Sequence, residues 1–422
     1  HPVSTPTRTL QIRLHLIETQ LDMRAARHAE AVQRLQRCRI LAAGIRDQPD
    51  VRDRLLQNIE ALHAQCLVQL GRYSDVARLF EDRAGRTDSS ADQWTAAARA
   101  WRTADNVPAA VRCYRNAIFR LGCYSDVWLE YVHLLKDTRG IDEAVDEVAF
   151  RHRRAQHGPP IADAILAQAW EIVGQSDRAI THYRSAAKRN THDVAALAIA
   201  LTREGKVEDA IVLVADEAWS VNSSIRAHTA AIVGVSAAHL SVASRITIMQ
   251  IVEEGIAAAS DDVTLLLAAV EWYTKCQAGS VAIELLHRAV ALQPANVVAA
   301  NNLAMLLADE DQSFDQALGY IESVLKQAGP VPEFLDTKGW ILVQMNRAQE
   351  ALPWLLKAAE GSSSTDAISQ LHLAAAYMDV GDPEQAKEHF ESATAGRIRP
   401  ELLNTSEQRA WATLQQEFTP QV

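Results

Sequence analysis

Small apolar residues recur along the chain at intervals close to 34 residues, with one interval of about double that length. They are Val76, Ala110, Ala144, Ala179, Ala210, Ala282, Ala317, Ala351 and Ala386. Each is followed four positions later by a large apolar residue, as Ala110 is by Tyr114. Residues four apart share one face of an α-helix, so the pattern predicts a helix around each of these positions. A small side chain beside a large one lets a neighbouring helix approach closely.

A second apolar pattern lies about 12 to 16 residues before each of these positions. Trp94, Ala97 and Trp101 illustrate it, because residues at i, i+3 and i+7 form a stripe along one helix. In several intervals the turn between the two helices carries a Gly, which supplies the positive φ that commonly ends a helix. These residues are Gly71, Gly174, Gly205 and Gly381. The chain is therefore predicted to be an array of helix–turn–helix units.

This unit resembles the tetratricopeptide repeat, whose motif W-x-x-L-G-x-x-Y…A-x-x-x-F…P recurs every 34 residues. The resemblance covers residues 57–394 and implies an all-α, right-handed superhelical solenoid. Stretches at 301–304, 335–340 and 351–353 are similar to bacterial tetratricopeptide proteins, some of which serve envelope or exopolysaccharide export. Units are predicted to begin near Gln57, Ala91, Ser125, Pro160, Thr191, Val263, Val297, Pro332 and Ala367.

The register predicts five segments. They are an N-terminal helical region with a divergent repeat (1–56), a repeat array (57–221), a degenerate repeat (222–260), a second array (261–396), and a C-terminal capping helix with a tail (397–422). The capping helix is predicted from Ser406 to Phe418, with Ser406 as its N-cap. Such a helix would cover the open apolar face of the last repeat.

Composition agrees with a packed helical array and excludes several other classes of protein. Of the 422 residues 48% are hydrophobic, which excludes a disordered chain. The 17 Gly and 13 Pro are too few for an all-β chain rich in tight turns. No apolar run reaches the roughly 18–20 residues of a membrane-spanning helix. The five Cys show no zinc-type spacing and are expected to be small buried hydrophobes.

No motif for catalysis or cofactor binding is found in the sequence. It contains no Gly-rich phosphate loop, no His-Glu-x-x-His, no nucleophile elbow and no calcium loop. We therefore predict no catalytic residue, no metal and no cofactor. The basic run 151–154 (Arg-His-Arg-Arg) is expected at the end of a second helix, where cations suit the helix dipole. Four aromatic residues are expected in the core rather than stacked on nucleic acid, namely Trp94, Trp101, Trp128 and Trp170.

The resemblance also implies a binding surface, because positions 2, 5, 9 and 12 of each first helix line the concave face in this family. In the N-terminal part the partner-binding residues would be Arg99, Arg102, His133 and Lys136, which are expected to form one positive patch. In the C-terminal part they would be Asn301, Met305, Asp336, Trp340 and Met378. The motif does not need the two Met and the Trp for packing. An exposed apolar groove is expected there, unless a neighbouring helix or the chain tail covers it.

The charge distribution favours an acidic protein partner. The net charge is −11, yet residues 1–155 hold 24 Lys and Arg against 20 Asp and Glu, whereas residues 156–422 hold 18 against 33. A positive patch suits an acidic peptide or, in an export system, an anionic polymer. Nucleic acid is not an expected partner, because its binding depends on neutralising many phosphates and the net charge is negative.

The leading hypothesis is a non-catalytic scaffold or adaptor that binds a protein partner or peptide segment along its groove. Two alternatives stay open: the repeat portion of a larger enzyme or of a bacterial envelope or polysaccharide export machine, and a free-standing enzyme. A cytoplasmic location is expected. A periplasmic location stays open, because the chain starts at His1 without an initiator Met.

Overall fold

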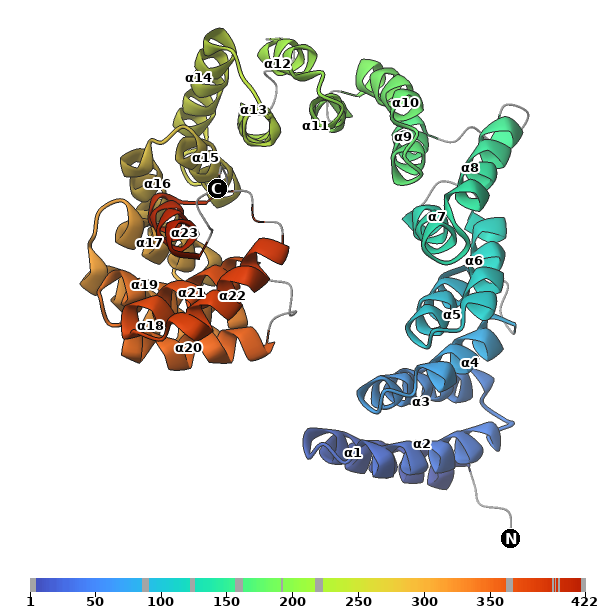
Figure 1. Ribbon diagram of the computed structural model, residues 1–422. Coiled ribbons are helices and arrows are strands. Elements are labelled where there is room, and N and C mark those ends of the chain that lie inside the picture. Colours follow the sequence, from blue (N-terminus) through green and yellow to red (C-terminus); the bar gives the residue numbers. More distant parts are fainter. Residues whose placement is uncertain are drawn as a thin grey trace. The chain divides into compact units, whose positions relative to one another are not determined.

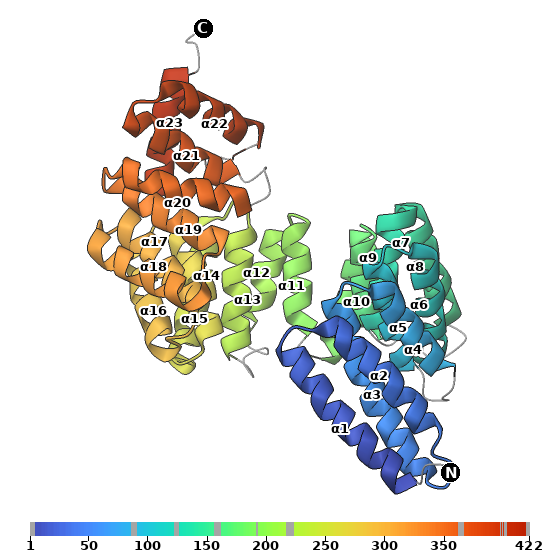
Figure 2. The same ribbon diagram turned by 90° about the horizontal axis from the view of Figure 1, so that it is seen from below.

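The protein is described by a computed structural model, and all the regular structure of its described residues is helical, as the sequence predicts (Figures 1 and 2). The described residues are 5–85, 91–121, 126–155, 162–190, 193–216, 223–361, 367–396, 398, 400 and 403–418. The predicted unit starts at Ser125, Pro160 and Thr191 lie outside them, as does Cys123. The chain divides into two compact units, His1–Asp193 and Val194–Val422. The predicted segment limits remain predictions.

The first unit contains ten helices among its described residues, and helices that follow one another in the chain pack together. They are α1 (Thr5–Arg24), α2 (His28–Ala43), α3 (Pro49–Gln69), α4 (Tyr73–Ala84), α5 (Ala91–Thr103), α6 (Val107–Leu121), α7 (Asp126–Arg139), α8 (Ile141–Ala155), α9 (Asp163–Ile172) and α10 (Ser176–Arg189).

The second unit continues the same alternation of first and second helices and ends in one additional helix, α23. Its helices are α11 (Val194–Arg203), α12 (Val207–Ala215), α13 (Ser223–Ser236), α14 (Val242–Ala258), α15 (Val263–Lys275), α16 (Gly279–Leu292), α17 (Val297–Asp309), α18 (Phe314–Ala328), α19 (Pro332–Gln344), α20 (Ala348–Gly361), α21 (Ala367–Val380), α22 (Pro383–Ala395) and α23 (Thr405–Phe418).

The recurring small residues occupy the packed interior of the repeats. Each of the eight Ala lies on an even-numbered helix, which is the second helix of its repeat, and none is more than 1% exposed. First helices of neighbouring repeats also touch each other, as α17 touches α19 and α19 touches α21. Each unit is therefore held together mainly by contacts between neighbours, as in a solenoid.

The predicted turn glycines have the expected backbone conformation. Gly71, Gly174, Gly205 and Gly381 have φ between 67° and 83°. Among the described residues, five other turns reach the left-handed region with a residue that has a side chain, and these are Ala26, Asp105, Gln277, Gln312 and Asn346. The left-handed turn therefore belongs to the repeat geometry and persists where Gly is absent.

The buried positions follow the sequence predictions closely. Cys38, Cys66 and Cys113 are buried, and Cys276 is half-buried. Trp101, Trp128 and Trp170 are buried in the core, whereas Trp94 is half-buried. Helix α3 begins at Pro49, eight residues before the unit start predicted near Gln57. Pro49 lies in the first turn, where a missing N–H costs no hydrogen bond, so the helix can begin at this residue.

The degenerate repeat forms two complete helices, α13 and α14. Gly234 of α13 lies against the Trp272 ring of α15, and a Cβ at Gly234 would come within 2.5 Å of that ring. The Lys275 ammonium donates to the carbonyls of Gly234, Val235 and Ala237 at distances of 3.0, 2.7 and 2.5 Å. An aromatic ring and a cation from the following repeat therefore support the C-terminal end of α13.

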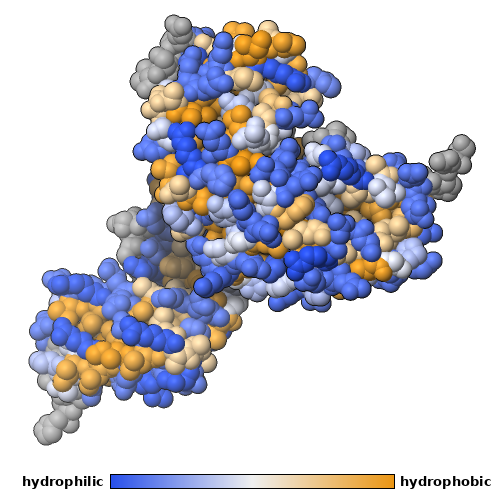
Figure 3. All heavy atoms as spheres, turned by 90° about the vertical axis from the view of Figure 1, so that its left-hand side faces the viewer, coloured by the Kyte–Doolittle hydropathy of each residue, from blue (hydrophilic) through white to orange (hydrophobic). Residues whose placement is uncertain are grey.

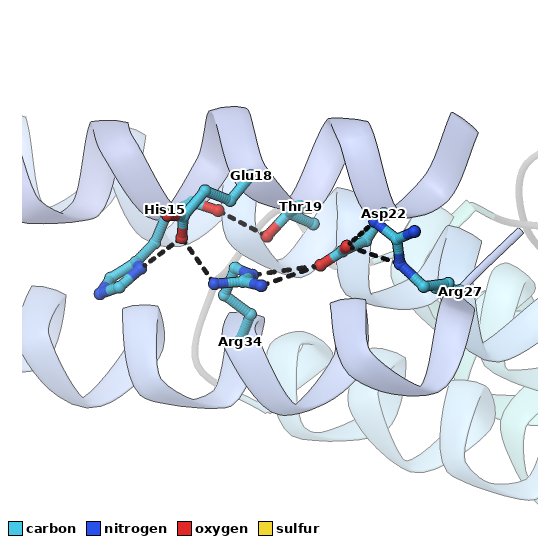
Figure 4. A network of polar contacts seen from close by, with 6 residues as sticks. All are labelled: His15, Glu18, Thr19, Asp22, Arg27 and Arg34. Carbon is cyan, nitrogen blue, oxygen red and sulfur yellow. Dashed lines mark hydrogen bonds and ion pairs between the residues drawn. The ribbon is translucent and has the colours of Figure 1, made fainter. Parts of the chain in front are cut away.

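A polar network joins the first two helices (Figure 4). Asp22 of α1 binds Arg27 through Oδ1 at 2.8 Å and Arg34 of α2 through Oδ2 at 3.1 Å. Arg34 also reaches Oε2 of Glu18 at 2.5 Å. The pKa of the Asp22 carboxyl lies below its usual value, and the hydrogen bond from Arg27 is the largest cause of this shift.

The outer side of α1 carries a stripe of large apolar side chains. Leu10, Leu14, Ile17 and Leu21 are each between 54% and 61% exposed. Hydrophobic surface is visible on the N-terminal part of the molecule, at the lower left of Figure 3. The opposite side of the helix buries Ile12. Among the described residues, no helix is both long and apolar enough to cross a membrane.

Candidate functional site

The predicted partner-binding residues belong to two surfaces, one in each compact unit. Arg99 and Arg102 lie on α5, and His133 and Lys136 lie on α7; these four residues are called the cationic surface below. The other five lie on α17, α19 and α21 and are called the C-terminal concave site. All four residues of the cationic surface are exposed.

Glu130 of α7, which is not among the predicted site residues, joins the two helices of the cationic surface. Nε of Arg99 donates to Oε1 and Oε2 of Glu130 at 3.2 and 3.0 Å, and Nη2 lies 2.5 Å from Oε1. The hydroxyl of Tyr114 donates to Oε2 at 2.9 Å. Burial raises the pKa of Glu130, but the bonds from Arg99 and Tyr114 and the charge of Arg102 outweigh it, so the pKa is lowered overall.

One of the four residues expected to form the positive patch, Arg99, is thus paired with a carboxylate. The Arg99 guanidinium is held by Glu130 in a forked arrangement, which fixes its direction. Arg102, His133 and Lys136 form no ion pair with another described residue. These three side chains, one on α5 and two on α7, are the part of the surface that can meet an incoming carboxylate.

At the other end of the chain, α23 begins against the C-terminal concave site. Oδ1 of Asn404 accepts the Glu407 N–H at 2.8 Å, and Oε2 of Glu407 accepts the Asn404 N–H at 2.9 Å. This reciprocal pair is a capping box, so the N-cap is Asn404 and the prediction of Ser406 was wrong. The spacing Asn404-x-x-Glu407 was the signal in the sequence.

A carboxylate from α17 completes this helix start. Oδ2 of Asp309 accepts the Thr405 N–H at 3.2 Å, and Oδ1 accepts the Ser406 N–H at 2.7 Å. Asp309 is almost fully buried, and a negative charge at this point also favours the helix dipole. Residues nearly a hundred positions apart thus fix where α23 starts.

The centre of the C-terminal concave site is a buried histidine between two carboxylates. Nδ1 of His372 lies 2.8 Å from Oδ2 of Asp336, and its Nε2 lies 3.3 Å from Oε1 of Glu407. The ring is 1% exposed and stacks on Trp340, with the ring centroids 4.1 Å apart. Burial alone would lower the pKa of His372, but Asp336 and Glu407 raise it to about 10.

The predicted exposure of Trp340 was wrong. Trp340 is 2% exposed, its Nε1 donates to Oγ of Ser406 at 3.1 Å, and its ring belongs to the core shared by α19 to α23. Farther along α23, Trp411 and Phe418 pack against Phe390 of α22, with ring centroids 5.0 and 6.0 Å from that of Phe390. The physical reason is that the C-terminal helix covers this face.

The remaining residues of the C-terminal concave site are only partly covered. Asn301, Met305 and Met378 are half-buried, and Oδ1 of Asn301 has no hydrogen-bond partner among the described residues. Beside α23 a cavity of about 430 Å³ is lined by residues that include Trp340, Met378 and Arg409. What is left of the predicted apolar groove is therefore this cavity at the side of α23.

Comparisons with known proteins support the repeat architecture. The family model described as "Tetratricopeptide repeat" matches residues 53–210. The comparison with curated proteins gives no match.

Solved structures resemble the chain only loosely. The APC/C hetero-tetramer Cut9-Hcn1 is 13% identical, with 95% of this chain and 83% of that one covered and a TM-score of 0.41. MamA AMB-1 is 22% identical, with 42% and 98% covered and a TM-score of 0.33. PilF of Pseudomonas aeruginosa is 15% identical, with 58% and 99% covered and a TM-score of 0.39. Overlaps this loose carry no conclusion about partners.

Proposed function

Because the chain is a tetratricopeptide repeat protein, we propose that it is a non-catalytic adaptor whose cationic surface binds an acidic segment of a protein partner. Proteins of this repeat type are typically interaction scaffolds. The finer assignment rests on one observation. Arg102, His133 and Lys136 are exposed on α5 and α7, and no described carboxylate pairs with them.

The Arg99–Glu130 pair supports this assignment by its position. It ties α5 to α7, so the three other cations are presented from two linked helices. Arg102 can form two parallel hydrogen bonds with a carboxylate, which gives direction as well as charge. Exposed pairs contribute about 0.2–1 kcal/mol each, so useful affinity needs several acidic side chains in the bound segment.

The C-terminal concave site is the weaker candidate for the same role. Its aromatic centre is already covered by α23, which supplies Ser406 to Trp340 and Glu407 to His372. A segment of a partner would have to displace this helix or be confined to the cavity beside it. The alternative role, as the repeat portion of a larger enzyme or export machine, is compatible with the same acidic ligand.

Binding of a fluorescein-labelled deca-glutamate peptide, followed by fluorescence anisotropy, tests the proposal. The wild-type protein should bind it more tightly than labelled deca-lysine. Arg102→Glu with Lys136→Glu should weaken binding by about tenfold, because about 1.4 kcal/mol corresponds to that factor. Raising the salt concentration should weaken wild-type binding in the same direction.

The matched control reverses two exposed arginines elsewhere in the same unit. Arg37 lies on α2 and Arg184 on α10, and both are exposed. Arg37→Glu with Arg184→Glu makes the same change in net charge, so a general effect of charge would appear in both variants. Equal loss in the two variants, or normal binding by Arg102→Glu with Lys136→Glu at low salt, would show that the cationic surface is only a solvated helix face.

A further inference from the structure

A second cluster of basic side chains surrounds a cavity formed by α8, α9 and α10. The cavity measures about 480 Å³, and its lining includes His152, Arg153, Trp170, Asp177, Arg178 and His182. The basic run noted in the sequence supplies two of these residues from the last turn of α8. The dipole of α8 accounts for cations at its end, but it does not account for the basic residues that meet them from α10.

The rings of the cluster lie close together. The imidazoles of His152 and His182 meet edge to face, with their centroids 4.9 Å apart. His152 also meets the Trp170 ring edge to face at 6.1 Å, and the Arg178 guanidinium lies over that ring at 4.6 Å. Arg153 lines the same cavity and is exposed. Helices α8 and α10 thus bring four basic side chains to one opening.

Few negative charges oppose them. On α9, Oδ1 of Asp163 lies 2.9 Å from Nδ1 of His182, and its Oδ2 pairs with Arg189. On α8, Glu147 is held by Arg151 at 2.8 Å. Asp177 of α10 is the one carboxylate that lines the cavity among the described residues.

The two histidines make the charge of the cluster variable. Burial lowers the pKa of both, and the charges of His182 and Arg178 lower that of His152 further. Near neutral pH both rings are therefore mostly uncharged, while Arg153 and Arg178 remain cations. A bound anion would favour the protonated rings, which adds donors and charge toward it.

We propose that the cavity between α8, α9 and α10 binds a divalent oxyanion of the phosphate or sulfate type. Arg153 and Arg178 supply guanidinium groups, whose geometry suits tetrahedral oxyanions. His152 and His182 donate when protonated. Trp170 lines the cavity, and its buried Nε1 has no acceptor among the described residues. The volume leaves room for the group that carries the anion. The proposal does not depend on the cationic surface of α5 and α7.

Sulfate is the right probe, because it stays doubly charged between pH 5.5 and 7.5, whereas a phosphate ester titrates near pH 6. Isothermal titration calorimetry of the full chain at constant ionic strength should show one sulfate site. The affinity for sulfate should increase about tenfold from pH 7.5 to pH 5.5, the factor that corresponds to a change of one in a pKa. NMR titration should show sulfate raising the pKa values of His152 and His182.

Substitutions separate the two parts of the site. Arg153→Gln with Arg178→Gln should abolish binding, and His152→Gln with His182→Gln should remove its dependence on pH. Arg184→Gln with Lys188→Gln on α10 is the charge-matched control, because both residues are exposed and neither lines the cavity. Absence of saturable sulfate binding at pH 5.5, or full binding by Arg153→Gln with Arg178→Gln, would overturn the proposal.

Two competitors identify the source of the anion. A neutral peptide with one phosphoserine and the small compound N-acetylphosphoserine amide are each titrated against bound sulfate. Tighter binding of the peptide supports a phosphorylated side chain of a protein partner, and equal binding supports a small anion. Failure of both to compete would contradict recognition of a phosphoryl group.

Discussion

At the scale of single residues, turn geometry costs stability wherever the repeat lacks its glycine. Gln277 has φ of 58°, in a turn between two helices like that in which Gly205 has φ of 73°. An L-residue in this region costs about 1–2 kcal/mol. A Gly at this position would avoid that cost, and its extra flexibility in the unfolded chain would offset only about 0.5–1 kcal/mol of the gain.

Gln277→Gly is therefore expected to stabilise the protein by about 0.5–1 kcal/mol, the difference between these two effects. Gly205→Ala should destabilise it by a similar amount, because nothing lies within 4 Å of the added Cβ and only backbone strain remains. Urea denaturation followed by circular dichroism measures both. A shift of the same sign in both variants would contradict the explanation.

Residue positions on a helix could be predicted from the sequence, whereas contacts between residues of different helices could not. Periodicity placed the repeating Ala, the buried Trp128 and the exposed Arg102 correctly, because a helical face is a local property. It did not give Glu130 beside Arg99, or Asp309 at the start of α23. Those contacts join different helices, and their side-chain directions depend on packing that the repeat register does not specify.

At the scale of elements, α23 depends on one buried cation. His372 lies between Asp336 of α19 and Glu407 of α23, so it neutralises charge on both sides of the contact. Replacing it leaves two carboxylates without their partner, and breaking a buried ion pair costs about 3–5 kcal/mol. His372→Gln should therefore loosen α23 and make it more sensitive to proteolysis.

The effect should depend on pH in a defined direction. The pKa of His372 is about 10 in the folded protein, above the value near 6.5 expected when unfolded. Its stabilisation is therefore fully present below about pH 6.5 and is lost as pH rises through about 10.

Thermal unfolding of wild type and His372→Gln should differ most at pH 6.5 and least at pH 10.5. His287→Gln, at an exposed position on α16, is the control for loss of a histidine. A gap in Tm that stays constant with pH would contradict the role of the charged ring.

At the scale of the whole molecule, the excess of positive charge and the repeats covered by α23 lie in different parts of the sequence. The positive excess of residues 1–155 includes the cationic surface and the basic run of α8, whereas the acidic remainder contains α23 and the repeats it covers. The sequence predicts a capping helix and leaves open that the chain tail covers the groove, but it does not specify that α23 reaches Trp340, His372 and Asp309. Only packing specifies those contacts.

Hydrogen exchange measured by mass spectrometry, with and without the deca-glutamate peptide, shows most directly where an acidic segment binds. Exchange should slow in the peptides covering residues 91–103 and 126–139, which form α5 and α7. It should stay unchanged in those covering 367–380 and 405–418, which form α21 and α23. Protection confined to the latter pair, or no protection despite saturating peptide, would contradict binding at the cationic surface.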